Sequence, residues 1–300
     1  MIVFNFLLYY LLMIPLSVLP FFVLHGISNF FYFILYHVVG YRKKVVMENI
    51  RNSFPEKSIE EQKKICREFY AFLCDLVLET FKTFTISEKQ LRRHVTCKNP
   101  EVLNRYHAEN KSVIVTVGHF NSWEMLLTGS HLFVKHNMVV IYQPLSNIYY
   151  DRKLIETRAQ FGTTMLPKNE VKNYFQSNKN LNATVFAIDQ SPPNSKNCYW
   201  MKFLNQETGI LFGAEKYAKE FNQPVVFARL NKIKRGHYEL EFTDVCSDPQ
   251  KTQYGEITEK TTRLLEKDII AHPELWLWSH KRWKHKREAA GDEGRGESGK

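Results

Sequence analysis

The residues in this sequence best suited to acid–base chemistry are His119 and Glu124, which stand five positions apart. An imidazole exchanges a proton near neutral pH. A carboxylate that accepts a hydrogen bond from one ring nitrogen selects the tautomer and raises the basicity of the other nitrogen. The pair therefore predicts a general base that removes a proton from an attacking hydroxyl, with Glu124 orienting His119. The spacing alone is weak evidence, because many such pairs lie on surfaces or in satisfied cores.

No protein side chain stands out as a nucleophile. The sequence contains no GxSxG motif, and its five cysteines are scattered and form no CxxC pair. The attacking hydroxyl would then belong to a substrate. The odd, dispersed cysteines predict reduced thiols in the cytoplasm rather than a disulfide framework. No Cys/His cluster has metal-ligand spacing, so neither a metal nor a cofactor is expected.

The elements around His119 predict where it lies in the fold. His119 follows a β-branched run and precedes a helical pattern, so it falls at the end of a buried strand, where open α/β sheets usually bind ligands. From Ser112 onward, short β-rich runs alternate with amphipathic segments, which predicts an α/β fold with a mostly parallel, twisted sheet flanked by helices. The expected strands are Val113–Val117, Met138–Tyr142, Thr163–Leu166, Thr184–Ile188, Val225–Leu230 and Tyr238–Thr243. The expected helices are Trp123–Phe133, Tyr149–Phe161, Glu170–Ser177, Ala214–Phe221 and Glu256–Ile270.

Residues 1–41 contain no Asp, Glu, Lys or Arg and are predicted to anchor the chain in a membrane. Ile2–Leu24 is long and apolar enough to cross a bilayer as a helix that its two prolines would kink. A signal peptide is disfavoured, because there is no basic n-region and no small-residue cleavage site. His25–Gly40 is expected to form an interfacial helix or the second half of a hairpin. The basic run Arg42–Lys44 then predicts that the following domain stays on the cytoplasmic side.

The rest of the chain divides into three parts. Residues 42–110 are expected to form a helical segment that packs on the core, with Ser58 capping a helix whose first turn is acidic. Residues 111–288 form the predicted α/β domain. Residues 289–300 are small, Gly-rich and charged, and are expected to be disordered.

The overall charge and the carboxy-terminal tryptophans suggest anionic partners. Lys plus Arg exceeds Asp plus Glu by 41 to 31, a formal net charge of +10. Trp276, Trp278 and Trp283 alternate with basic residues, a mixture that suits a membrane interface or nucleic acid. The apolar amino terminus favours the membrane, so no nucleic acid partner is expected. One or two of these tryptophans are equally compatible with covering the core.

With these motifs, the sequence resembles the bacterial lipid A biosynthesis acyltransferases, within the wider lysophospholipid acyltransferase group. That group carries a histidine, four residues and then Asp or Glu, which here reads His119-Phe-Asn-Ser-Trp-Glu124. The resemblance covers nearly the whole chain and implies a glycerolphosphate-acyltransferase-like fold. Further matching blocks follow in order: Tyr142-Gln-Pro-Leu-Ser-Asn147, Asp151 with Arg158 and Phe161-Gly162, Ile188-Asp189-Gln190, Thr208-Gly209, Pro224-Val-Val, and Pro273–Lys284.

The resemblance implies a role for each matched residue. His119 would deprotonate an acceptor hydroxyl, Glu124 would orient and polarise it, and the hydroxyl would attack the thioester of an acyl carrier without an acyl-enzyme intermediate. Arg158 would bind a phosphate with its guanidinium fork. The other residues assigned to substrate binding are Asp189, Gln190, Asn121 and Asn147.

From the residues alone, two of these roles have simpler alternatives. Arg158 is better explained, without the family, as a solvated charge on a helix face, and Asp189 is explained almost as well as a turn residue before Ser191-Pro192-Pro193. The sequence also departs from the family pattern. Gln143 stands where many members carry Arg or Lys, and the stretch from Tyr199 lacks the usual Pro and Gly. These departures leave the exact acceptor open.

The function expected from the sequence is transfer of a fatty acyl chain to a hydroxyl of a lipid A precursor at the inner membrane, with the catalytic domain on the cytoplasmic face. The donor would be acyl carrier protein or a coenzyme A thioester, and the acceptor a phosphorylated glycolipid; a basic surface suits both anionic partners. One alternative keeps the chemistry and changes the acceptor to an aminolipid or lysophospholipid. The other is a catalytically inactive, basic protein that binds membrane lipids.

Overall fold

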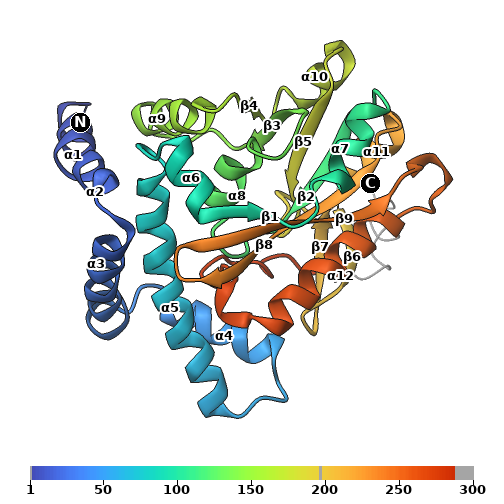
Figure 1. The fold of residues 1–300 in the computed structure, drawn as a ribbon. Helices are drawn as coiled ribbons and strands as arrows, with labels where there is room; N and C mark the ends of the chain where they lie inside the picture. The colour runs from blue at the N-terminus through green and yellow to red at the C-terminus, as the bar shows by residue number, and fades with distance from the viewer. Residues whose placement is uncertain (1, 196–197, 288–300) are drawn as a thin grey trace, which may run out of the picture.

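A seven-stranded sheet forms the centre of the protein, and helices cover both of its faces (Figure 1). The computed structural model describes residues 2–195 and 198–287, so the predicted disordered tail lies outside the described residues. The strand order is β1-β9-β8-β2-β5-β3-β4. The five strands from β8 to β4 are parallel to one another, β9 is antiparallel to β8, and β1 is parallel to β9. The strands are β1 Val95–Cys97, β2 Val113–Val117, β3 Asn137–Tyr142, β4 Thr164–Pro167, β5 Asn182–Ala187, β8 Val225–Lys234 and β9 His237–Cys246.

The expected α/β fold with a mostly parallel sheet is confirmed. Every residue of β2 is buried, because successive side chains of a strand point to opposite faces and both faces are covered. Val115 packs in the cluster on one face and Ile114 in the cluster on the other. The helices that follow the amino-terminal region are α4 Lys43–Ser53, α5 Ile59–Lys82, α6 Glu88–His94, α7 Glu101–Ala108, α8 Trp123–Ser130, α9 Ile148–Ala159, α10 Val171–Ser177, α11 Gly213–Glu220 and α12 Glu256–Ala271.

The segment between the amino-terminal helices and β2 consists of helices joined by short turns, together with β1, a strand that was not predicted from the sequence. Helix α5 begins at a capping box in which Ser58 and Glu61 satisfy each other's backbone N–H groups, as the acidic first turn suggested. Strand β1 is only three residues long, too short for an alternating pattern. It pairs with β9 at the edge of the sheet.

A separate hairpin, β6 Cys198–Phe203 and β7 Gln206–Leu211, was also not predicted. Its two-residue turn, Leu204-Asn205, has φ angles of 47° and 63°. Such turns match the right-handed twist of the flanking strands and usually contain Asn-Gly or Asp-Gly. Leucine at the first turn position gives no such signal, so the sequence does not show this hairpin.

The amino-terminal region forms two helical segments rather than the single span expected at Ile2–Leu24. The chain is helical from Ile2 to Val18 (α1, η1 and α2) and again from Phe21 to Val39 (α3 and η2). Leu19 and Pro20 between them are extended, with ψ angles near 150°. Proline restricts the preceding residue to extended conformations and supplies no N–H, so the continuous helix is wrong.

By length and composition, Phe21–Val39 is the helix among the described residues that can cross a membrane, and only 11% of its apolar window is buried. It lies along α5 (Figure 1). Asn5–Val18 is apolar but shorter. The outward side of these helices exposes large apolar side chains such as Leu11, Phe22 and Val38. The choice between an interfacial helix and a hairpin stays a prediction.

The prediction that the carboxy-terminal tryptophans face a membrane is wrong for two of them. Trp276 and Trp278 are 2% and 0% exposed and meet each other edge to face. The Trp278 indole N–H donates to the Pro273 carbonyl oxygen, so its polar atom is satisfied inside the protein. Trp283 is partly buried against the same cluster. The alternative that they cover the core accounts for these positions.

Candidate active site

His119 and Asp189 meet at the carboxyl ends of two neighbouring strands. Strands β2 and β5 are parallel and in register, with Val117 opposite Ala187 at their last residues. His119 and Asp189 each stand two positions beyond these residues, so the register brings them side by side. The carboxyl edge of a parallel sheet is the usual place for a ligand.

Asp189, and not Glu124, accepts the ring hydrogen bond of His119. The distance from His119 Nδ1 to Asp189 Oδ1 is 2.7 Å, and the backbone N–H of His119 donates to Oδ2 over 2.8 Å. The indole N–H of Trp276 also donates to Oδ2, over 2.8 Å. Because the Asp189 side chain is only 2% exposed, these bonds define its position. The expectation that Glu124 accepts this ring proton is therefore wrong.

The two partners shift each other's pKa in opposite directions. Burial is the largest influence on His119 and acts to lower its pKa. The charge and hydrogen bond of Asp189, with a contribution from the charge of Glu124, outweigh burial and hold the pKa of His119 above its ordinary value. Burial likewise acts to raise the pKa of Asp189, but the charge of His119 and the bonds from His119 and Trp276 hold it below its ordinary value. A carboxylate beside Nδ1 thus leaves Nε2 as the basic nitrogen.

The Nε2 side of His119 opens on a cavity of about 270 Å³. The side-chain amide of Gln190 lies 3.2 Å from Nε2, where a substrate hydroxyl would need to approach. Most of the cavity wall is apolar, and its inner end lies between β3, β5 and α8. The lining side chains are Val117, Trp123, Leu126, Leu127, Val140, Ile141, Leu145, Leu154, Val185 and Ala187, with Tyr142, Gln143, Arg158 and Gln190 as polar members.

Glu124 forms a two-bond ion pair with Arg158. The guanidinium donates from Nε to one carboxylate oxygen over 3.0 Å and from an Nη atom to the other over 2.5 Å. The Glu124 and Arg158 side chains are 6% and 13% exposed, so the pair is largely shielded from water. Helices α8 and α9 are thereby joined beside the cavity. Their catalytic and phosphate-binding roles stay predictions, although Arg158 already has a carboxylate partner.

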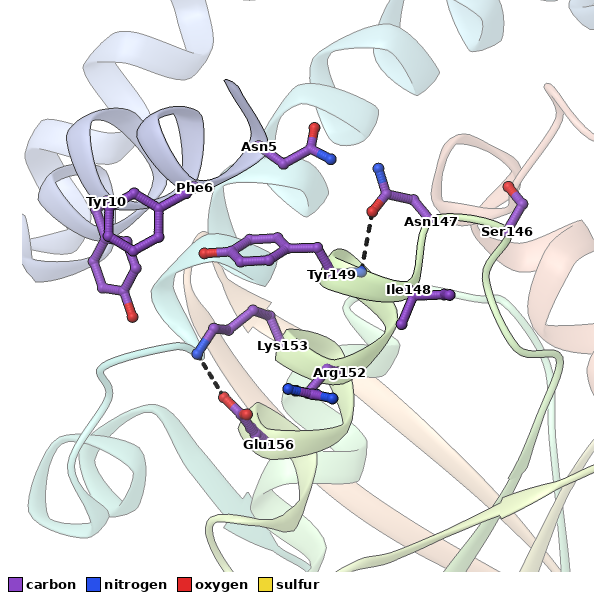
Figure 2. Close-up of a pocket in the computed structure, with 10 residues that line it drawn as sticks. All are labelled: Asn5, Phe6, Tyr10, Ser146, Asn147, Ile148, Tyr149, Arg152, Lys153 and Glu156. Carbon is purple, nitrogen blue, oxygen red and sulfur yellow. Dashed lines mark hydrogen bonds and ion pairs between the residues drawn. The ribbon is translucent and has the colours of Figure 1, made fainter. Parts of the chain in front are cut away.

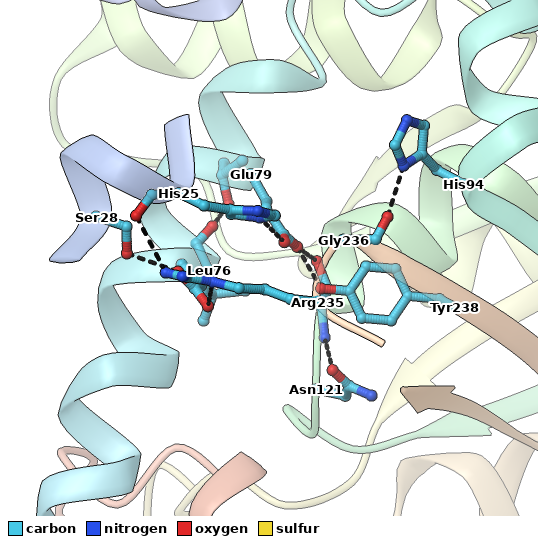
Figure 3. Close-up of polar contacts among 12 residues, drawn as sticks. His25, Ser28, Leu76, Glu79, His94, Asn121, Arg235, Gly236 and Tyr238 are labelled. Carbon is cyan, nitrogen blue, oxygen red and sulfur yellow. Dashed lines mark hydrogen bonds and ion pairs between the residues drawn. The ribbon is translucent and has the colours of Figure 1, made fainter. Parts of the chain in front are cut away.

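Asn121 supports the turn that carries His119 and does not line the cavity. It has a positive φ of 58°, and its side chain donates to the Leu230 carbonyl and accepts from the backbone N–H of Ser122. The hydroxyl of Ser122 donates to Glu79, a buried carboxylate on α5. Glu79 also accepts bonds from His25 and Tyr238 (Figure 3). This turn is therefore held by hydrogen bonds on both sides.

Asn147 also lies outside the His119 cavity. It is the N-cap of α9, and its side-chain oxygen accepts from the backbone N–H groups of Tyr149 and Tyr150. Of the expected site residues, His119, Arg158 and Gln190 line this cavity, and Asp189 and Glu124 are bonded to His119 and Arg158. Asn121 and Asn147 occupy structural positions. Their proposed substrate contacts stay predictions.

Three partners of the site were not predicted. Trp276 donates to Asp189, and Glu79 holds the turn beside His119. His280 lies near His119 and Asp189, where its Nε2 accepts from the backbone N–H of Ser191. The matched block around Trp276 and His280 was the available signal, but its alternation of aromatic and basic residues favoured a membrane interface.

Comparison with known proteins identifies the family of this chain. Residues 2–285 match the model of the family described as bacterial lipid A biosynthesis acyltransferase. The chain is 22% identical over 244 residues to the lipid A biosynthesis palmitoleoyltransferase of Escherichia coli K12, covering 81% of this chain and 79% of the relative. A lipid A biosynthesis acyltransferase of Shigella flexneri gives the same values. The lipid A biosynthesis lauroyltransferase of E. coli K12 is 21% identical over 247 residues, with the same coverage. The protein described above therefore belongs to the bacterial lipid A biosynthesis acyltransferase family, a family of enzymes.

Proposed function

We propose that this protein transfers a fatty acyl chain from the thioester of acyl carrier protein to a hydroxyl of a phosphorylated lipid A precursor, with His119 as the general base. The observation that carries the proposal is the His119–Asp189 pair at the mouth of an apolar cavity. One nitrogen of the imidazole is held by a carboxylate, and the other faces the space where substrates would meet.

The reaction needs no covalent enzyme intermediate. The acceptor hydroxyl displaces the amide of Gln190 from His119 Nε2 and gives its proton to that nitrogen. Its oxygen attacks the thioester carbonyl carbon, and the tetrahedral intermediate expels the carrier thiolate. The imidazolium returns the proton to the thiolate sulfur, which leaves an ester and a free thiol. Asp189 stabilises the imidazolium while it exists.

The cavity suits an acyl chain. Its inner wall consists of aliphatic side chains from β3, β5 and α8, so a chain bound there leaves water and gains about 0.8 kcal/mol for each buried methylene. Glu124 and Arg158 neutralise each other at one side and bring no uncompensated charge to the cavity. In this proposal the pair positions α8 and α9 and tunes His119 through the charge of Glu124.

We also propose that the protein works at the cytoplasmic face of the inner membrane. The exposed apolar side of the amino-terminal helices would enter the bilayer, and the basic run from Arg42 to Lys44 would remain in the cytoplasm. Acyl carrier protein and a phosphorylated glycolipid are both anionic and would be attracted by the net positive charge.

The test uses purified full-length protein in neutral detergent with acyl carrier protein thioester and lipid A precursor. We expect turnover by the wild type and a loss of roughly 10²-fold or more for His119→Ala, because proton transfer by a positioned base contributes about that much. Lys172→Gln, an exposed change on α10, is the control. Full activity of the His119 variant would overturn the mechanism. Coenzyme A thioesters, lysophospholipid and aminolipid tested in parallel identify the donor and acceptor.

A further inference from the structure

A second cavity, of about 780 Å³, lies on the far side of α9 from His119. The amino-terminal helix lines one wall with Asn5, Phe6 and Tyr10, and the start of α9 lines the other (Figure 2). Leu154 and Arg158 of α9 face the His119 cavity, whereas Arg152 faces this one. Because α9 lies between the two spaces, they are about one helix diameter apart, roughly 10 Å.

Asn5 is a polar side chain without a polar partner inside this cavity. It is 8% exposed and stands in a segment that otherwise consists almost entirely of apolar residues. Its amide points across the cavity toward Asn147 (Figure 2), yet within residues 2–195 and 198–287 it makes no hydrogen bond. The amide of Asn5 is therefore available to a ligand that enters the cavity, as a donor through its NH₂ group and as an acceptor through its oxygen.

Arg152 supplies a cation that no carboxylate neutralises. Neighbouring Lys153 is paired with Glu156 over 2.7 Å, and Arg158 is paired with Glu124. Arg152 is exposed and forms no ion pair with any residue that the structure describes. Of the two arginines on α9, it is therefore the one whose guanidinium is available to an anion. Its fork geometry suits the paired oxygens of a phosphate.

We propose that this cavity binds the phosphate of the glycolipid acceptor, with Arg152 as the main contact and Asn5 and Ser146 as further hydrogen-bond donors. This assignment rests on the proposed function and moves the phosphate contact from Arg158 to Arg152. Phe6 and Tyr10 would cover the apolar part of the same molecule. Binding here would leave an acceptor hydroxyl within reach of His119 on the other side of α9.

The experiment measures steady-state kinetics and equilibrium binding with two acceptors, the phosphorylated glycolipid and the same glycolipid without its phosphate. In neutral detergent without phospholipid, we expect Arg152→Gln to raise KM for the phosphorylated acceptor by about tenfold or more and to leave kcat and the KM of the donor unchanged. Wild type and Arg152→Gln should bind the dephosphorylated acceptor alike. Asn5→Leu should act in the same direction, and Lys172→Gln should change neither constant.

Two outcomes would overturn the assignment. One is an unchanged KM for the phosphorylated acceptor in Arg152→Gln. The other is an Arg152 effect that appears only after phosphatidylglycerol is added and is equal for both acceptors, which would identify a site for bilayer phospholipid. The binding measurement does not require turnover. If the wild type binds the phosphorylated acceptor through Arg152 and transfers no acyl chain, the reaction proposal fails while this site stands.

Discussion

Replacing Asp189 with asparagine tests the pairing that the structure assigns to His119. Oδ2 of Asp189 accepts two hydrogen bonds, from the His119 backbone N–H and the Trp276 indole N–H, both over 2.8 Å. In Asp189→Asn, the amide oxygen would take this position, because an NH₂ group cannot accept from either donor. The NH₂ would then face His119 Nδ1, which must become an acceptor. The imidazole proton would move to Nε2, and the base would be lost.

The expected loss follows from two contributions. Removing a charge-assisted hydrogen bond to the imidazolium costs about 1.5–3 kcal/mol, roughly 10- to 150-fold in rate. Reversing the tautomer adds to this, and the same change in a serine-protease triad lowers kcat by roughly 10⁴-fold. We therefore expect kcat for Asp189→Asn to fall by about 10³-fold or more, with little change in KM for either substrate.

The assay is steady-state acyl transfer by Asp189→Asn and Glu124→Gln, with thermal unfolding to confirm that both variants fold. If Asp189 orients His119, Asp189→Asn should lose more activity than Glu124→Gln. The original expectation from the sequence, in which Glu124 is the orienting carboxylate, predicts the opposite order. A folded Asp189→Asn variant within tenfold of wild-type kcat would refute the reasoning.

Three further outcomes are expected. His119 must be neutral to act as a base, and Asp189 holds the pKa of His119 above the ordinary value of 6.5. In the wild type, kcat measured against pH should therefore fall as the pH drops through that raised pKa. In Asp189→Asn, the residual activity should fall at a lower pH, because the carboxylate that raises the pKa is gone. Glu124→Gln leaves Arg158 as an unpaired, largely buried charge, so the free energy of unfolding measured by denaturant titration should fall by about 3–5 kcal/mol. The double variant with Arg158→Gln should recover part of this loss, because it removes the unpaired charge. Gly118→Ala would put a Cβ 2.5 Å from Leu265 Cδ1 in the core and should cost about 1–3 kcal/mol by the same measurement, less when Leu265→Val is added.

The parts of the fold that could be predicted from the sequence are those with a local pattern. Strand β2 is a run of β-branched residues that ends at a glycine, and α5 begins at a capping box, so each element carries its own signal. Strand β1 and the β6–β7 hairpin carry none, because one is too short for a pattern and the other turns at Leu204-Asn205. Strand β1 forms by pairing with β9, which is distant in the sequence, whereas β6 and β7 pair with each other.

The partner of His119 could not be predicted for a related reason. A carboxylate five positions away is visible in the sequence, whereas Asp189 is 70 positions away and becomes a neighbour only when β2 and β5 pair in parallel. Both strands were predicted, and Asp189 was placed just after the second. The sequence does not show the order of the strands in the sheet, so Glu124, the carboxylate nearer in the sequence, was expected to be the partner of His119.

The apolar amino-terminal helix is attached to the catalytic turn by directed polar bonds. Apolar contacts alone would let a helix slide or rotate on α5, because they have no preferred direction. Glu79 accepts from His25 on this helix over 3.2 Å and from Tyr238 on β9 over 2.5 Å (Figure 3). It also accepts from Ser122, next to the His119 turn, over 2.9 Å. One turn earlier on α5, Asp75 accepts from Ser28 over 2.6 Å. A buried carboxylate is costly when it loses a partner, so rotation of the helix on α5 would leave Glu79 and Asp75 each short of a hydrogen bond. The orientation of the apolar helix and the position of the turn beside His119 therefore depend on the same carboxylate.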